Sequence, residues 1–552
     1  LIYGLGKSGI SSHEFLKKKA DTYLFDDNPK INKKLVSLNK ILKISFDAII
    51  IGSGIGGLVT ASQLAAKGAQ VLVLEKYIIP GGSGGSFKRK GYTFDVGASM
   101  IFGFGDKGYT NLLTRALKDV NEKCETIPDP VQLEYHLPNN FSISVDKNYE
   151  QFISKLSASF PKEKKGIKKF YDTCASVFKC LDSMPLLSIE DPSYLFKVFF
   201  KSPLSCLGLA RWLPANAGDV ARKFIKDPEL LKFIDIECFC WSVMPALKTP
   251  MINAGMVFTD RHAGGINYPK GGVGTIAEKF VSGIEKLGGK VRYKANVTEI
   301  LLKDEKAVGV KLSNGEEIYS NIIVSNSTRW DTFGLKDNTK GLISTKNVPK
   351  SEYKWLENYK PSPSFVSIHL GVEKNLISDN FNCHHIIVEN WDELESEKGV
   401  IFVSIPTLLD SSLAPEGKHI VHAFTPSSMS EWEGLSRKEY LQKKEKYFSF
   451  LVEKISTILP NLEQNIDHKE IGTPKTHKKF LGRYEGSYGP IPSKKLLGLL
   501  PMPFNTTKIQ NLYCVGDSCF PGQGLNAVAF SGYACAHKIG AKLNINSFKL
   551  PD

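Results

Sequence analysis

The sequence predicts a mixed α/β fold with α+β parts, in which a nucleotide-binding domain is interleaved with a second domain. Three observations carry this prediction. A glycine-rich turn joins an apolar strand to a helix near residue 52, strand and helix patterns alternate again between about 251 and 335, and a strand, a glycine turn and a helix follow residue 511. Alternating strands and helices are typical of parallel α/β sheets. Because the three patterns are far apart, the domain has to be assembled from separate segments.

The first segment contains a complete βαβ unit. The apolar strand Ala48–Ile51 leads into the turn Gly52–Gly57, a helical stretch reaches Lys67, and the strand Val71–Leu74 ends in Glu75. A plain glycine loop can match the glycine spacing alone. The flanking strands, the helix and the terminal acid together predict a Rossmann-type unit that binds a dinucleotide.

The residues of this turn have separate expected roles. Gly52 allows the tight turn, Gly54 lets the backbone approach a pyrophosphate, and Gly57 lets the helix and strand pack closely. Gly56 lies between them. Glu75 can accept hydrogen bonds from ribose hydroxyls. These five residues are therefore predicted to bind the cofactor.

The next stretch favours FAD over NAD. A second glycine-rich loop, Pro80–Gly85, is followed by the aromatic, acid-bearing segment Gly91–Gly97. An NAD-binding dehydrogenase would continue here with a simple βα unit, whereas flavoproteins often place a glycine loop against the extended FAD. We expect Gly81 and Gly82 to contact the cofactor, although a loop without function remains the alternative.

The C-terminal pattern suits the flavin end of the same cofactor. A short strand, Asn511–Val515, leads through Gly516 and Asp517 to a turn that ends at Gly524, and the apolar helix Leu525–Leu543 follows. The amides and the dipole at a helix N-terminus can stabilise the negative charge of a reduced flavin ring. Asp517 is expected to bind ribityl or phosphate-side hydroxyls, or else to act only as a cap or turn residue.

The length of 552 residues predicts at least two domains. A strand that begins at Val297 is expected to contact the adenine side of FAD. We predict nucleotide-binding segments at 46–125, 251–335 and 481–552, and a substrate- and membrane-facing domain at 126–250, which has a helical, aromatic and basic pattern, and at 336–480.

Residues 1–44 form a second, shorter fingerprint unit. Gly4–Gly9 resembles the opening of the Mur ligases, but nothing after it continues that family. We expect an extraneous leader and not a second working nucleotide site.

The composition limits the kinds of binding partner that we expect. The hydrophobic content of 42% is that of a globular protein, and the net charge of +14 needs an anionic partner or serves solubility. An anionic lipid surface fits best, because no nucleic-acid motif is present. The uncharged stretch Ala48–Ala66 is nearly long enough to cross a bilayer, but its glycines and its βαβ pattern argue against a span. We also expect no secretory signal.

Cysteine and histidine patterns predict neither disulfides nor a metal site. The ten cysteines are scattered without a Cys-x-x-Cys pair, which is typical of reduced thiols. His384 and His385 are neighbours, but adjacent strand residues point to opposite faces.

Several long segments carry a family resemblance. The sequence resembles the FAD-dependent carotenoid cis-trans isomerases, also called prolycopene isomerases, which are relatives of bacterial phytoene desaturases. The resemblance covers Phe46 to about Leu543 and rests on five segments: Leu74–Phe87, Gly91–Gly108, Pro250–Gly274, Thr476–Pro492 and Leu512–His537.

The resemblance implies a peripheral membrane protein on the cytoplasmic side of the cell membrane, or on the thylakoid membrane, of an oxygenic phototroph. It implies conversion of poly-cis lycopene to all-trans lycopene without net redox change, on reduced FAD, with NAD(P)H as a candidate reductant. An apolar tunnel should hold the carotenoid, since each buried CH₂ is worth roughly 0.8 kcal/mol. Three rivals are a carotene desaturase, a retinol-saturase-like reductase and a carotenoid-binding protein without flavin.

The stretch from Tyr194 to Arg222 is a candidate membrane-docking segment. Its alternative is a helical face that covers the core. Basic residues that can meet anionic headgroups alternate with aromatic residues that can enter the interface. The basic residues are Lys197, Lys201, Arg211 and Arg222, and the aromatic residues are Phe196, Phe199, Phe200 and Trp212.

Glu237 is the predicted catalytic acid. It lies with Asp235 in the aromatic stretch Phe233–Trp241, and burial among aromatic rings raises the pKa of a carboxyl group. A protonated Glu237 could donate a proton to the polyene or to flavin. The alternative is a structural carboxylate that pairs with an Arg or Lys.

Overall fold

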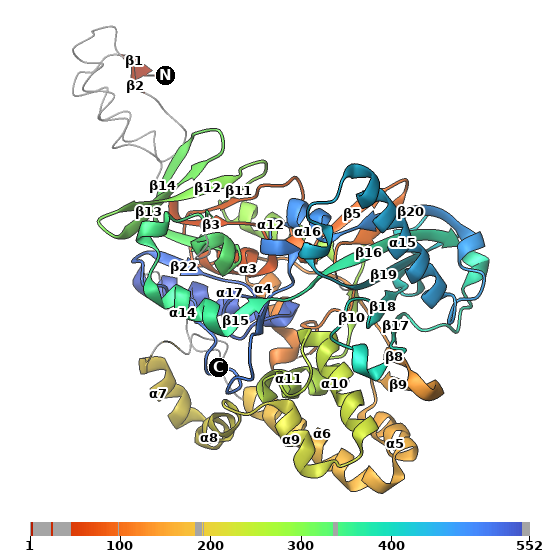
Figure 1. The fold of residues 1–552 in the computed structure, drawn as a ribbon. Helices are drawn as coiled ribbons and strands as arrows, with labels where there is room; N and C mark the ends of the chain where they lie inside the picture. The colour runs from red at the N-terminus through yellow and green to blue at the C-terminus, as the bar shows by residue number, and fades with distance from the viewer. Residues whose placement is uncertain are drawn as a thin grey trace.

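A computed structural model describes residues 2–3, 24–25, 46–97, 99–106, 108–182, 190, 192–334 and 340–543. Two sheets and a layer of helices make up the main body (Figure 1). Within the predicted leader, the short strands β1 (Ile2–Tyr3) and β2 (Leu24–Phe25) pair in parallel. The rest of residues 1–44 lies outside the described residues.

The first sheet is the nucleotide-binding sheet. Its parallel part contains β11 (Lys290–Arg292), β4 (Val71–Leu74), β3 (Phe46–Ile51), β14 (Glu317–Ser325) and β22 (Leu512–Cys514). The strands β12 (Val297–Lys303) and β13 (Lys306–Leu312) extend β14 in antiparallel fashion. Strands from three distant parts of the chain therefore form one sheet.

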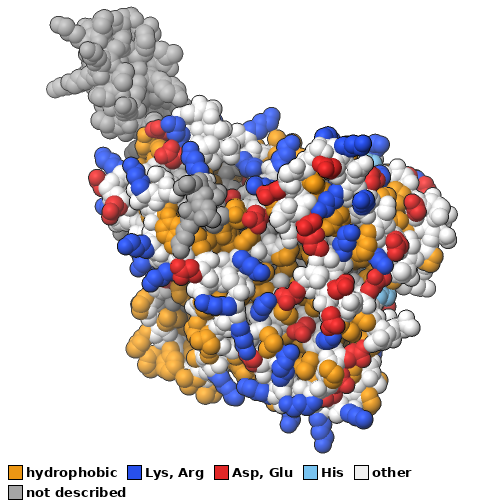
Figure 2. Space-filling view, in the orientation of Figure 1, with side chains coloured by type: hydrophobic (Ala, Val, Ile, Leu, Met, Phe, Trp, Pro, Cys, Tyr) orange, Lys and Arg blue, Asp and Glu red, His pale blue; other side chains and the backbone are white. Residues whose placement is uncertain are grey.

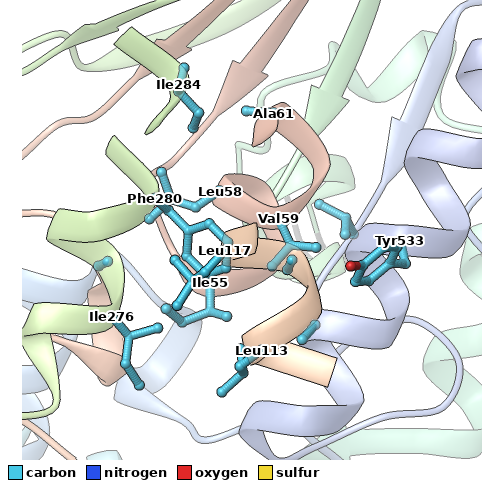
Figure 3. Packing of buried hydrophobic residues seen from close by; sticks show 14 of the residues in the cluster. Ile55, Leu58, Val59, Ala61, Leu113, Leu117, Ile276, Phe280, Ile284 and Tyr533 are labelled. Carbon is cyan, nitrogen blue, oxygen red and sulfur yellow. The ribbon is translucent and has the colours of Figure 1, made fainter. Parts of the chain in front are cut away.

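Helices cover this sheet with an apolar core. The helix α3 (Ile55–Ala65) lies between α12 (Gly274–Lys286) and α17 (Leu525–Lys542), and all eleven of its residues are buried. Its Leu58 and Val59 pack with Phe280 and Tyr533, as Figure 3 shows. The helices α3 and α17 approach closely, since a Cβ at Gly532 would lie 2.7 Å from the carbonyl oxygen of Gly56.

The second sheet has seven strands from two parts of the chain. Their order is β20 (Ile466–Gly472), β16 (Ser364–Glu373), β19 (Lys418–Ser427), β18 (Ile401–Ser404), β17 (His384–Ile387), β8 (Val131–Leu137) and β9 (Phe141–Asp146). The helix α15 (Arg437–Ile455) packs on it through residues such as Leu451.

The helical layer lies below both sheets in Figure 1. It contains α5 (Tyr149–Ser159), α6 (Lys164–Asp182), α7 (Pro192–Lys201), α8 (Pro203–Trp212), α9 (Ala217–Phe224), α10 (Pro228–Ser242) and α11 (Met251–Ala263).

Two details differ from the sequence-based expectation. The range 126–250 begins with strands and not helices, because alternate residues of Val131–Leu137 face the core. The helix α11 packs against α6, so the start of the predicted range 251–335 lies with the helical layer. In the described part of the chain, no helix combines the length and the apolarity needed to cross a bilayer.

Candidate functional site

A cavity of about 830 Å³ opens where the parallel strands of the nucleotide-binding sheet end. The residues that follow β3, β4, β14 and β22 all line it, which is where ligands bind in open α/β sheets. Ten of the eleven predicted cofactor residues are in this lining: Gly52, Gly54, Gly56, Glu75, Gly81, Gly82, Val297, Gly516, Asp517 and Gly524. The sequence prediction therefore converges on one cavity.

The glycines are needed for close approach. Gly52 has φ 91°, in the left-handed region that favours glycine. A Cβ at Gly54 would lie 2.6 Å from Nδ2 of Asn326. Gly57 lies outside the cavity lining, and a Cβ there would meet the carbonyl oxygen of Gly52 at 2.6 Å. This is the helix–strand packing position expected of Gly57.

Asn326 was missed by sequence reasoning. It directly follows β14 and touches the first glycine turn as well as Gly516. The available signal was its place immediately after a buried strand, which is also the place of Gly52.

Glu75 holds the glycine turn in shape. Its Oε2 accepts hydrogen bonds from the amide of Ser53 at 2.9 Å and from the Ser53 hydroxyl at 2.7 Å. Its Oε1 accepts one from the amide of Tyr77 at 2.8 Å. The side chain is buried yet lines the cavity, so it can both support the turn and face a ribose.

The predicted flavin end of the cavity lies at the N-terminus of α17. Gly516 and Gly524 have φ values of 105° and 99°, and α17 begins directly after Gly524. Arg483 donates a hydrogen bond to Asp517, and both residues line the cavity. Asp517, which was predicted from the sequence, therefore forms an ion pair with Arg483 that the sequence spacing did not indicate.

These residues fit FAD. The first turn of α3 is buried, and no side chain caps its N-terminus. The free amides of such a helix start need an acceptor, which a pyrophosphate supplies. The cavity lining also includes both Val297, which is predicted for the adenine side, and Leu525 at the N-terminus of α17.

One part of the cavity lining, named the apolar arm below, consists of apolar side chains from the helical layer and from residues 99–106. Met100, Phe102, Trp241, Met256 and Val257 line this arm. Such side chains suit an extended hydrocarbon ligand.

Two buried histidines also line the cavity, and sequence reasoning missed both. His477 lies 3.1 Å from the hydroxyl of Tyr488, while His369 lies 3.0 Å from the carbonyl oxygen of Asp95. Burial lowers the pKa of His477 to about 4 and that of His369 to about 3, so both rings are neutral at pH 7.

Glu237 does not line the cavity. Its side chain is fully buried, and its Oε1 lies 2.5 Å from Nη1 of Arg261. The hydroxyl of Tyr171 donates to its other oxygen. This geometry favours the structural ion pair over the predicted general acid, because Glu237 faces Arg261 and Tyr171 and not the cavity. Its neighbour Asp235 caps a turn by accepting from the amide of Ala246.

The two strand histidines gain partners from a distant strand. His385 Nδ1 lies 3.1 Å from Nε2 of His136, and His384 Nε2 lies 3.7 Å from Oδ2 of Asp129. The parallel pairing of β17 with β8 brings these groups together, which local sequence could not indicate. The absence of a metal site stays a prediction.

The fold and the cavity are those of a flavoenzyme, because the cavity at the end of the nucleotide-binding sheet has residues that fit FAD and an apolar part of its lining. Residues 55–539 match the family described as flavin containing amine oxidoreductase, and the chain belongs to that family.

Individual relatives agree with this class. The chain is 57% identical over 502 residues to prolycopene isomerase 1, chloroplastic, of an Oncidium hybrid cultivar, covering 91% of this chain and 84% of the relative. It is 54% identical over 502 residues to prolycopene isomerase, chloroplastic, of Arabidopsis thaliana, covering 91% and 83%. Among solved structures, a putrescine oxidase has a TM-score of 0.60 at 13% identity, covering 90% of this chain and 99% of that one. This last similarity concerns the fold alone.

Proposed function

We propose that this protein isomerises poly-cis lycopene to all-trans lycopene on reduced FAD, without net redox change. The observation that carries the proposal is the 57% identity, across 91% of the chain, to a protein named prolycopene isomerase. The apolar arm that adjoins the flavin end of the cavity agrees with a hydrocarbon substrate.

The cofactor and the chain have separate tasks. When bound, reduced flavin supplies electron density that can lower the order of a polyene double bond. Phe102, Trp241 and Val257 hold the polyene and exclude water, since every buried CH₂ contributes roughly 0.8 kcal/mol. The N-terminus of α17 and the guanidinium of Arg483 place positive charge at the flavin end.

The test is anaerobic incubation of the purified protein with prolycopene in liposomes. FAD is reduced with dithionite in one arm and with NADPH in another, and products are separated by chromatography with absorption spectra. We expect all-trans lycopene in both arms, without stoichiometric consumption of reductant. A requirement for oxidised flavin and an electron acceptor would indicate a desaturase. A product with a shorter conjugated system than the substrate would indicate a reductase. Conversion without any flavin would also contradict the proposal.

A membrane surface is the proposed source of the substrate. The helices α7 and α8 present an exposed apolar patch of Leu195, Phe196, Phe199, Phe200, Leu204 and Leu207, which are 41–84% exposed. Figure 2 shows it as a large orange area at the lower left, over α7 and α8. Lys201 and Arg211 flank it as exposed cations. An apolar face rimmed by cations suits an anionic bilayer interface.

The other predicted docking residues are placed differently. Trp212 is half-buried with Arg211 stacked 4.9 Å from its ring centre, and Arg222 donates to the carbonyl oxygen of Gly218 within α9. The side chains of Tyr194 and Lys197 lie outside the described residues. The docking proposal therefore rests on the apolar patch and two cations.

Liposome flotation tests this surface. A Phe200→Ser and Leu204→Ser double variant should lose most binding to anionic vesicles and keep FAD. The matched control is Leu441→Ser, because Leu441 on α15 is 44% exposed and lies away from the patch. Equal binding by all three proteins would overturn the docking proposal. Since the relatives are named chloroplastic, a thylakoid membrane is the proposed location.

A further inference from the structure

Asp260 is a carboxyl group on the wall of the apolar arm. It lies on α11, on the same helical face as Met256 and Val257, and all three line the cavity. Only 2% of its surface is exposed to solvent. The helical layer contributes no other carboxylate to the described lining of the cavity.

The carboxyl group of Asp260 is sparsely paired. Its Oδ2 accepts a hydrogen bond from Nδ2 of Asn526 at 3.2 Å, and Oδ1 is buried beside the backbone of Gly264. The adjacent Arg261 is engaged with Glu237. By contrast, the other carboxylates of the described lining accept several hydrogen bonds or pair with an arginine: Glu75, Asp331, Glu470 and Asp517.

Its surroundings hold the proton in place. Burial raises the pKa of Asp260 to about 8, the nearby carboxylate of Asp182 on α6 adds to the rise, and the backbone amide of Gly264 offsets part of it. At pH 7 the acid form then predominates by roughly ten to one. Because Asn526 is in the first turn of α17, this acid stands between the apolar arm and the flavin end.

We propose that Asp260 is the general acid and base of the reaction, a role that rests on the proposed isomerase function. Asp260 borders the apolar arm of the cavity, and Oδ2 is the carboxyl oxygen that is not packed against Gly264. This oxygen exchanges a proton with a polyene carbon, and the amide of Asn526 orients it.

The step balances without an oxidant. Asp260 gives its proton to one carbon of a cis double bond, and the π electron pair forms the new C–H bond. The positive charge spreads over the remaining conjugated system, and the former double bond rotates as a single bond. The Asp260 carboxylate then removes a proton from the same carbon, and the returning electron pair forms the trans double bond.

The experiment compares Asp260→Asn with Asp172→Asn under the anaerobic assay with dithionite-reduced flavin. Asp172 is a matched control, since it lies on α6 in the same helical layer but outside the cavity lining, in an exposed pair with Lys168. Asp260→Asn should keep FAD and its KM, while kcat falls by roughly 100-fold or more, as for loss of a general acid. Asp260→Glu should recover part of the rate, and Asp172→Asn should retain the parent rate.

The pH profile of the parent protein gives a second readout. Because the acid form is the active one, kcat should be constant below pH 8 and fall as the pH rises through about 8. An Asp260→Asn variant within five-fold of the parent, or a parent profile that stays flat to pH 9.5, would overturn the role of Asp260. Should the Asn variant not fold, the parent profile alone decides. Failure of the parent itself to convert prolycopene would instead overturn the proposed function.

Discussion

Replacing Glu237 with Gln separates two explanations for the same buried carboxylate. The pair between Glu237 and Arg261 has both side chains at or below 1% exposure, and the guanidinium also lies 4.7 Å from the ring centre of Phe152. Gln keeps the shape and can still accept one hydrogen bond, but the guanidinium loses its counter-charge. The change should therefore destabilise the protein without touching the chemistry.

The expected loss of stability follows from the burial of the ion pair between Glu237 and Arg261. Removing one partner of a buried ion pair costs about 3–5 kcal/mol. We expect the lower end, about 3 kcal/mol, because the amide oxygen of Gln still accepts from Arg261. The entropy of unfolding is about 2.1 cal/mol/K per residue, which gives about 1 kcal/mol/K for a chain of this size. Dividing the loss of about 3 kcal/mol by this entropy predicts that Tm falls by about 3 °C.

The assay combines differential scanning fluorimetry with anaerobic isomerisation at 25 °C. Glu237→Gln should lower Tm while the isomerisation rate stays within a few-fold of the parent. A Glu237→Leu and Arg261→Met double variant should recover part of the lost stability, because no charge remains buried. An unchanged Tm together with a rate loss of about 100-fold would refute this reasoning and restore Glu237 as the catalytic acid.

Three further changes test the cofactor site and the leader. Gly54→Val should abolish FAD retention, because a side chain at this position meets Asn326 at 2.6 Å. The flavin absorbance of the purified protein measures FAD retention, and Ala66→Val at an exposed position is the control. Arg483→Gln should weaken FAD binding about tenfold by leaving Asp517 without its partner, as measured by flavin titration of the apoprotein. A protein that starts at Ser45 should keep FAD and isomerise normally, and loss of folding on truncation would show that residues 1–44 are integral.

Sequence reasoning found the parts of the site that depend on local backbone geometry. The spacing of glycines at a strand end indicates their role, so Gly52 and Gly516 could be predicted without a structure. The polar residues of the cavity could not be predicted. Asn326, Arg483 and Asp260 come from separate elements, and only the packing of those elements decides which side chains line the cavity.

The same limit explains Glu237. Its aromatic neighbours were visible in the sequence and predicted a dry environment, which the structure has. The counter-charge on Arg261, on the next helix, was not visible in the sequence, and Glu237 pairs with it at 2.5 Å outside the cavity lining. The strand pattern of Val131–Leu137 was misjudged for a simpler reason, since a short amphipathic strand was included in a range whose later residues are helical.

The contact between α3 and α17 has a consequence for synthesis of the protein. The hydroxyl of Thr60 donates to the carbonyl oxygen of Gly532, a separation of 472 positions. At about 5–20 residues per second, a ribosome needs roughly 25–95 s between these two positions. During that interval the apolar face of α3 has no permanent neighbour from α17, and the flavin end of the cavity cannot exist. The flavin end of the cavity can therefore form only after α17 has been synthesised, and the residues of α3 that face α17 stay uncovered until then.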